Sequence, residues 1–205
     1  MCSRASRSLA AAIVIAALAP PPAALAGEQK YEVLSASVRA TLAHAVNDRT
    51  PVDMKDLDTR AWVRGMTRKV QSQSRFPDED AARDFLAMVR YEAMRAGLDP
   101  HLVLAVVDVE SHFREYAVSK AGARGLMQVM PFWVREIGGS ADNLFQERTN
   151  LRYGCTILRH YLDRERGNVV NALGRYNGSL GQPGYPDLVL SALRTRWSLE
   201  SQARG

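Results

Sequence analysis

Glu110 is the residue of this sequence that is best placed for acid–base chemistry. It stands near the end of an apolar run that follows Asp99-Pro100, a helix N-cap with proline at the first helical position. The small residues of 121–125 (AGARG) come shortly afterwards and allow a close approach of backbone to backbone or ligand. A carboxyl group that ends an apolar helix and faces such a turn can act as a general acid. A lone helix-end glutamate is more often simply solvated, so the surrounding pattern has to decide.

The acids closest to Glu110 in the sequence do not form an obvious pair with it. Asp108 lies about 200° around the same helix, at roughly 100° per residue, and Glu115 lies beyond the helix end. Most glycosidases need two carboxylates, one as acid and one as base or nucleophile. Any reaction at Glu110 is therefore predicted to be one that a single carboxyl group can complete.

Other common site patterns are absent from the sequence. It contains neither a phosphate-binding loop nor a G-x-S-x-G elbow. Cys155 has no histidine arrangement that would make it a nucleophile, so we expect it to be a small buried apolar residue. The histidines stand apart, without metal-ligand spacing, at His44, His101, His112 and His160. We therefore expect no metal and no cofactor.

Short motifs in a fixed order surround Glu110. They are ESHF at 110–113, AVS at 117–119, GARGLMQ at 122–128 and MP at 130–131. The pattern continues with Asn150, Gly154, Tyr161-Leu162, Ala172 and Tyr176-Asn177. In this order and spacing the motifs resemble the lytic transglycosylase family of the soluble (SLT) type, whose catalytic domain is related to goose-type lysozyme. The resemblance covers roughly residues 84–195.

The resemblance implies a role for each residue that matches a family site position. Glu110 matches the catalytic acid. The positions that match substrate-binding residues are Ser119, Gln128, Met130, Tyr176 and Asn177. For Met130 and Tyr176, core packing is an equal alternative, because apolar groups at such spacing usually pack.

This chain departs from the family pattern after Tyr176-Asn177. The family often continues with Ala-Gly, whereas Gly178-Ser179 stands here. The usual Glu-Thr before a final tyrosine is also missing, and residues 181–184 read GQPG before Tyr185. The sequence therefore does not determine the shape of one wall of the expected cleft.

The activity that the resemblance implies is non-hydrolytic cleavage of the MurNAc-β-1,4-GlcNAc bond in peptidoglycan glycan strands. Glu110 would protonate the linking oxygen and, as a carboxylate, would then take the proton of the muramic C6 hydroxyl. That hydroxyl would attack C1 and leave a 1,6-anhydro-MurNAc end. The alternatives are a goose-type lysozyme-like hydrolase and a non-catalytic wall-binding or secretion-assembly module. An added acid near the cleft would favour the first, and loss of the acid would favour the second.

The first 26 residues have the pattern of an export signal peptide. Arg4 and Arg7 precede an apolar run at 9–19, and Ala24-Leu25-Ala26 forms a cleavage site. The run is too short for a transmembrane helix, and an uncut N-terminal anchor is the alternative. Removing the two arginines lowers the formal net charge from +5 to +3. That charge suits an anionic cell-wall polymer and does not indicate nucleic-acid binding.

We therefore expect an exported, periplasmic or cell-envelope protein with no integral membrane span after cleavage. Its expected partner is the peptidoglycan glycan strand, with an envelope or secretion-machinery protein left open as a second.

Apolar residues at three- and four-residue steps predict helices through the remaining chain. Their expected ranges are 31–46, 57–70, 78–97, 132–137, a helix to 166 capped by Thr149 or Asn150, 168–176, and a last one opening at Tyr185-Pro186. No alternating strand pattern of useful length occurs, so the predicted fold is all-α. The resemblance refines it to a lysozyme-like (goose-type) catalytic domain at 84–205, preceded by a helical extension at 27–83 and the signal peptide at 1–26.

Overall fold

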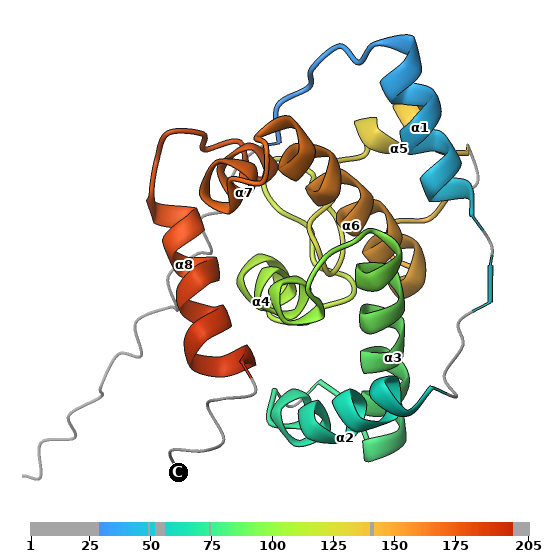
Figure 1. The fold of residues 1–205 in the computed structure, drawn as a ribbon, viewed down its shortest axis with the longest axis vertical. Helices are drawn as coiled ribbons and strands as arrows, with labels where there is room; N and C mark the ends of the chain where they lie inside the picture. The colour runs from blue at the N-terminus through green and yellow to red at the C-terminus, as the bar shows by residue number, and fades with distance from the viewer. Residues whose placement is uncertain (1–28, 49, 52–55, 74, 140–141, 199–205) are drawn as a thin grey trace, which may run out of the picture.

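The computed structural model describes residues 29–48, 50–51, 56–73, 75–139 and 142–198 (Figure 1). The predicted signal peptide at 1–26 lies outside them. In these residues the structure is helical without a strand, which confirms the predicted all-α class. Two isolated bridges, Val118 with Arg124 and Arg124 with Val129, tie the segment after the fourth helix into a compact loop.

The described part of the chain forms these helices in order. They are α1 (Ala36–Asn47), α2 (Leu57–Gln71), α3 (Glu79–Arg95), α4 (Pro100–Ser111), α5 (Phe132–Ile137), α6 (Glu147–Arg164), α7 (Val169–Asn177) and α8 (Gly184–Ala192). A π-helical turn, Leu193–Trp197, continues from α8. None of the described helices is both long enough and apolar enough to cross a membrane.

Helix α4 is the centre of the molecule. Figure 1 shows it end on, with α8 and α3 on opposite sides and α6 and α7 above. It packs against α3, α8 and the π-helical turn. Residues 103–107 of α4 are completely buried, since the helix is apolar nearly all round, as expected of a helix enclosed by others. Helices α1 and α2, from the predicted extension, pack against α5 and α6 and against α3, respectively.

Local signals placed most helix ends correctly. The Asp99 carboxylate caps α4 by accepting from the His101 N–H at 2.9 Å, with Pro100 at the first position. The Asp78 carboxylate caps α3 by accepting from the Ala81 N–H at 2.8 Å. Gly97 adopts the left-handed conformation expected after a helix, with φ at 65°.

The start of the first helix was predicted wrongly. Helix α1 begins at Ala36 rather than Tyr31, because the Ser35 hydroxyl caps it by accepting from the Val38 N–H. The preceding residues run extended, with Val33 83% exposed and Leu34 buried. The apolar residues that continued the 3.6-residue pattern before Ala36 therefore do not belong to a helix.

The cap of α6 was also predicted wrongly, with a consequence for the loop that follows α4. Helix α6 begins at Glu147, so Asn150 lies within its first turns and its N–H bonds to the Gln146 carbonyl. Its side chain reaches out of the helix instead. The amide nitrogen donates to the carbonyls of Arg124 and Leu144, and the amide oxygen accepts from the Met127 N–H at 2.7 Å.

Gly125 fits against this amide because it has no side chain. Its φ is 74°, and a Cβ there would lie 2.3 Å from Asn150 Nδ2 and 2.5 Å from the Leu144 carbonyl oxygen. Gly122, in the same loop, also has a positive φ, but a Cβ would meet no atom within 4 Å. An alanine at either position would carry backbone strain, but only at Gly125 would it also overlap with neighbouring atoms.

We predict that Gly125→Ala destabilises the protein far more than Gly122→Ala. The Gly122 variant carries backbone strain of about 1 kcal/mol. The Gly125 variant carries the same strain and also displaces the Asn150 amide, whose lost hydrogen bonds cost about 1 kcal/mol each. Urea unfolding measures both variants, and equal midpoints would contradict the packing described here.

Candidate active site

Glu110 is a buried carboxyl group at the end of α4. The residue is 8% exposed, and Val106 and Val107, one turn earlier in the helix, are completely buried. Burial raises the pKa of Glu110 to about 8, because removal from water disfavours the charged form. The Tyr185 hydroxyl donates to Glu110 Oε1 at 2.7 Å, which opposes the rise by stabilising the carboxylate.

Tyr185 is a site residue that the sequence reasoning missed. It lies in the first turn of α8, is 3% exposed and stands 75 residues from Glu110 in the chain. Burial and the nearby Glu110 carboxyl raise the pKa of Tyr185 well above its ordinary value, so its hydroxyl stays a donor. The signal that could have found it is the final tyrosine of the family pattern, although Tyr185-Pro186 by itself indicates only a helix start.

Tyr176 takes a different place from Tyr185. Its hydroxyl, fully buried at the end of α7, donates to the Met127 carbonyl at 2.7 Å. Burial, and then the nearby Glu110 carboxyl, raise the pKa of Tyr176 well above its ordinary value. The neighbouring Asn177 is 3% exposed and is the last residue of α7. Tyr176 therefore supports the loop after α4 through this hydrogen bond.

Gln128 and Ser119 hold that loop through hydrogen bonds to its own backbone. The Gln128 side chain, in a residue with φ at 48°, donates to the carbonyls of Ala117 and Gly125 at 3.2 and 3.0 Å. The Ser119 hydroxyl accepts from the Ala123 N–H at 3.1 Å. Gln128 is 5% exposed and Ser119 is half-buried, so Ser119 is the more open of the two.

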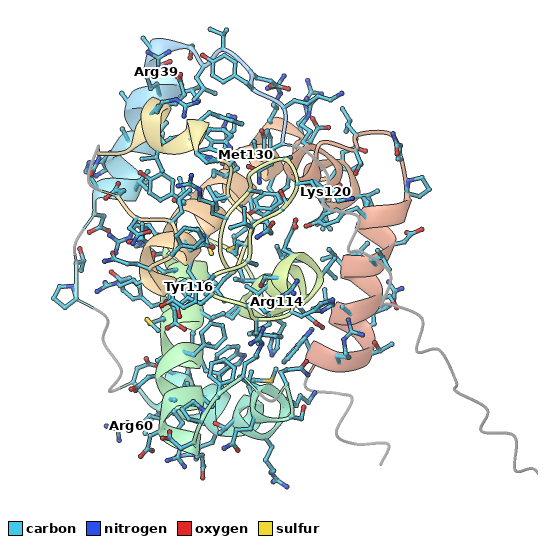
Figure 2. All side chains as sticks on the ribbon, turned by 180° about the vertical axis from the view of Figure 1, so that it is seen from behind. Arg39, Arg60, Arg114, Tyr116, Lys120 and Met130 are labelled. Atoms are coloured by element: carbon cyan, nitrogen blue, oxygen red, sulfur yellow. The ribbon has the colours of Figure 1, made fainter. Side chains whose placement is uncertain are left out.

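Met130 lies where the loop runs into α5 (Figure 2). It is half-buried and packs on the core with one side. Its N–H donates to Gln29 Oε1 at 3.4 Å, a contact with a residue far away in the sequence. The structure thus groups the predicted residues into the acid on α4, the loop that carries Ser119, Gln128 and Met130, and the end of α7.

The carboxylate of Asp108 is turned away from Glu110, as the helix geometry predicted. It accepts from Arg196 Nε at 2.7 Å and from Trp197 Nε1 at 2.9 Å, both in the π-helical turn. Asp108 thereby fixes that turn against α4. Its carboxylate accepts these hydrogen bonds and does not form a pair with Glu110.

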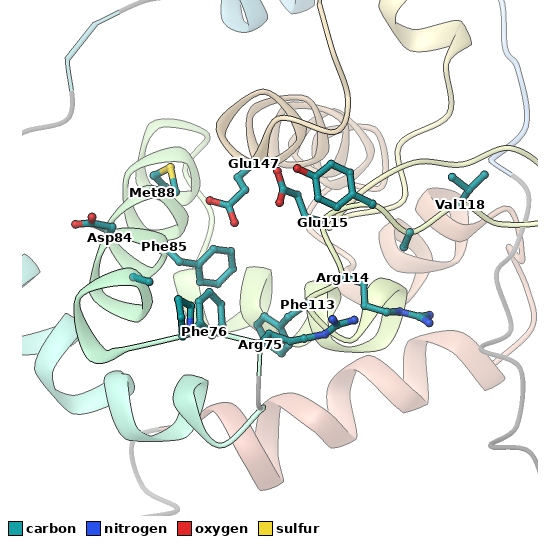
Figure 3. A pocket seen from close by; sticks show the side chains of 15 residues that line it. Arg75, Phe76, Asp84, Phe85, Met88, Phe113, Arg114, Glu115, Val118 and Glu147 are labelled. Carbon is teal, nitrogen blue, oxygen red and sulfur yellow. The ribbon is translucent and has the colours of Figure 1, made fainter.

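A groove of about 1080 Å³ opens between the start of α3 and the segment that follows α4. Phe76, Phe85 and Phe113 lie close together along it, and Glu115 and Glu147 point toward each other across its edge (Figure 3). Burial, and then the Glu115 charge, raise the pKa of Glu147. Glu115 lines this groove, whereas none of the predicted site residues, Glu110 included, does so.

The described residues contain no cluster of histidine, cysteine and acidic side chains that could hold a metal ion. Cys155 is completely buried, as expected, and burial raises the pKa of its thiol.

Comparisons with known proteins identify a family for this region. Residues 87–184 match the family described as Transglycosylase SLT domain, which confirms the resemblance drawn from the motifs. The membrane-bound lytic murein transglycosylase C of Actinobacillus pleuropneumoniae serotype 5b (strain L20) is 53% identical over 102 residues, covering 45% of this chain and 28% of that protein. Its namesake in Haemophilus influenzae (strain PittEE) is 34% identical over 134 residues, covering 58% of this chain and 38% of that protein.

The chain therefore spans about a third of the length of these curated relatives. A solved structure is also similar, the X-ray structure of an inactive mutant of the lytic transglycosylase Slt from Pseudomonas aeruginosa. It aligns at 19% identity with a TM-score of 0.42, over 87% of this chain and 38% of that one.

We predict that Glu110→Gln stabilises the protein at high pH and leaves its stability nearly unchanged at low pH. The folded state holds the Glu110 proton up to about pH 8, whereas the unfolded state loses it near the ordinary pKa of 4.5. Stability of the wild type therefore falls as the pH rises between these values, by at most about 1.4 kcal/mol per pH unit. Glutamine keeps the acceptor for Tyr185 and cannot ionise.

Thermal melting at pH 5 and pH 8.5 measures the difference. The gap in Tm between variant and wild type should widen at pH 8.5, and Asp187→Asn, at an exposed position on α8, serves as the control. A gap of equal size at both pH values would contradict the raised pKa of Glu110.

Proposed function

Because residues 87–184 of this chain match the family described as Transglycosylase SLT domain, we propose that the protein is a lytic transglycosylase that cuts peptidoglycan. The observation that carries the proposal is the Glu110 carboxyl, which is buried without a cationic partner among the described residues and is hydrogen-bonded by Tyr185. Glu110 stands at the motif position of the catalytic acid, and it lies within the residues that match the family. The substrate is the glycan strand, cut between MurNAc and GlcNAc.

The first step needs an acid that is protonated at neutral pH. With a pKa of about 8, Glu110 holds its proton there and can donate it to the oxygen that links the two sugars. A group whose pKa lies near the working pH is the most effective at such a transfer. The bond to C1 breaks as the oxygen takes the proton, and positive charge develops at the muramic C1.

The second step needs the same group as a base. Glu110, now a carboxylate, takes the proton of the muramic C6 hydroxyl, whose oxygen bonds to C1 and closes the 1,6-anhydro ring. The Tyr185 hydroxyl stabilises the transient carboxylate through its hydrogen bond. Asp108 is paired with Arg196, and Glu115 faces the groove, so neither is proposed as the base. Glu110 is therefore proposed to act first as the acid and then as the base.

Substrate positioning is proposed for the residues around the acid. Ser119 and Met130 are the more open side chains of the set, so they are proposed to contact the sugar and its N-acetyl group. Gln128, Tyr176 and Asn177 are buried, and their proposed contribution is to fix the loop that presents those contacts. We further propose an exported protein of the periplasm or cell envelope, with peptidoglycan as its partner.

We predict that digests of peptidoglycan with this protein contain muropeptides with 1,6-anhydro-MurNAc ends. An internal hydroxyl held next to C1 has a large effective concentration over water. Mass spectrometry distinguishes the outcomes, because the anhydro product is lighter by one water. Glu110→Gln is the matched control and should lower turnover by about 10²–10⁴, the usual contribution of a general acid.

Reducible muramic ends in a fresh digest would instead identify a lysozyme-like hydrolase. Turnover by a folded Glu110→Gln variant at the wild-type rate would remove Glu110 from the mechanism. Failure of the folded wild type to cut any peptidoglycan would leave a wall-binding module.

We also predict that Tyr185→Phe shifts the pH profile of kcat/KM. Without the hydroxyl, the carboxylate form of Glu110 loses its donor, so the pKa of Glu110 rises by about one pH unit. The limb that falls with increasing pH should move upward, and kcat at neutral pH should fall about tenfold. A profile that stays in place, or that moves to lower pH, would show that the hydrogen bond does not tune Glu110.

A further inference from the structure

An extended segment that lies outside the family-matched residues reaches the loop of the proposed site. Residues 29–35, here called the N-terminal strap, precede α1 and run across α5, α6 and α7. The Tyr31 ring meets Phe132 edge to face at 5.5 Å between centroids. Glu32 forms ion pairs with Arg164 on α6 and Arg175 on α7. The strap is thus fixed at several points on the surface of the molecule.

Gln29, at the start of the strap, enters the interior. It is 4% exposed, and its Oε1 accepts from Trp133 Nε1 at 3.0 Å and from the Met130 N–H at 3.4 Å. Its side chain also hydrogen-bonds the Tyr176 hydroxyl. A buried amide is costly unless its donor and acceptor are both satisfied, and Gln29 satisfies them with groups from three places in the fold.

These contacts join Gln29 to the supports of the substrate-facing loop. The Met127 carbonyl accepts from Tyr176, and the Met127 N–H donates to Asn150. Gln29 fixes the other end of the same short segment, at Met130. Of these three supports, Gln29 alone lies outside residues 87–184.

We infer that Gln29 is a positioning residue of the proposed active site, which holds the backbone of Met130 through the hydrogen bond it accepts from the Met130 N–H, while a second bond from Trp133 Nε1 fixes its own side chain. The inference rests on the proposed function. It assigns the support of the loop at Met130 to a segment outside the family-matched residues. Because Met130 carries a proposed contact to the sugar, Gln29 acts on substrate binding, and the protonation of Glu110 is independent of it.

The test compares Gln29→Met with wild type in the complete chain. Methionine keeps the length and volume of the side chain but can neither accept from Met130 and Trp133 nor donate to Tyr176. With a soluble uncross-linked glycan chain as substrate, KM should rise about tenfold, as expected for the loss of one to two hydrogen bonds. The value of kcat should stay within about twofold, and the pH limb that reports Glu110 should not move.

Tyr31→Phe is the matched control in the same strap. It removes the Tyr31 hydroxyl bond to Glu136, at an exposed residue, and keeps the ring on Phe132. Its KM should equal that of the wild type. An unchanged KM in Gln29→Met, or an equal rise in both variants, would overturn the assignment to Gln29.

A second measurement does not depend on catalysis. Hydrogen exchange of the Met130 amide should be about tenfold faster in Gln29→Met and in Gln29→Ala, since its acceptor is removed. An amide that stays protected in a folded variant would overturn the inference. A wild type that protects Met130 but does not cut peptidoglycan would refute the proposed activity, and the structural contact would stand.

Discussion

The burial of one carboxyl group without a cation is the constraint on which the site depends. Within the described chain, helices α3 and α4 bury three acids, and two of them meet arginine. Glu92 accepts from Arg152 at 3.1 Å, and Asp108 accepts from Arg196 at 2.7 Å. Glu110 has a tyrosine hydroxyl instead, and its pKa rises to about 8. A guanidinium favours the charged form strongly, whereas one neutral donor only partly offsets desolvation. Glu110 therefore keeps its proton near neutral pH, as the proposed mechanism requires, whereas Glu92 and Asp108 form ion pairs.

The loop after α4 is governed by the same need to satisfy buried polar groups. A loop packed against a core must hydrogen-bond its backbone groups, and here side chains do so. The Asn150 amide bonds two carbonyls and one N–H, and Gln128 and Tyr176 bond three more carbonyls between them. Gly125 leaves the space that the Asn150 amide occupies. The side chains that look like substrate ligands in the motif therefore include several that build the loop.

Segments on both sides of the family-matched region complete the structure around the site. The N-terminal strap brings Gln29 to Met130, and the π-helical turn brings Arg196 and Trp197 to Asp108. Each contact joins residues about 90 to 100 positions apart in the chain. The central helix α4 and its loop are thus held by the two ends of the described chain as well as by the helices between them.

The sequence by itself determined the helical class, most helix ends and the burial of Cys155, and it selected Glu110 as the candidate acid, because caps, periodicity and motif spacing act within a few residues. It could not determine that Asn150 lies inside α6 rather than at its cap, nor that Leu34 is buried outside a helix, since tertiary contacts override local preference there. The sequence also could not show which groups Tyr185 and Gln29 contact, because their partners lie far away along the chain. The bond from Tyr185 to Glu110 spans 75 positions, and only the packing of α8 on α4 brings the hydroxyl to the acid.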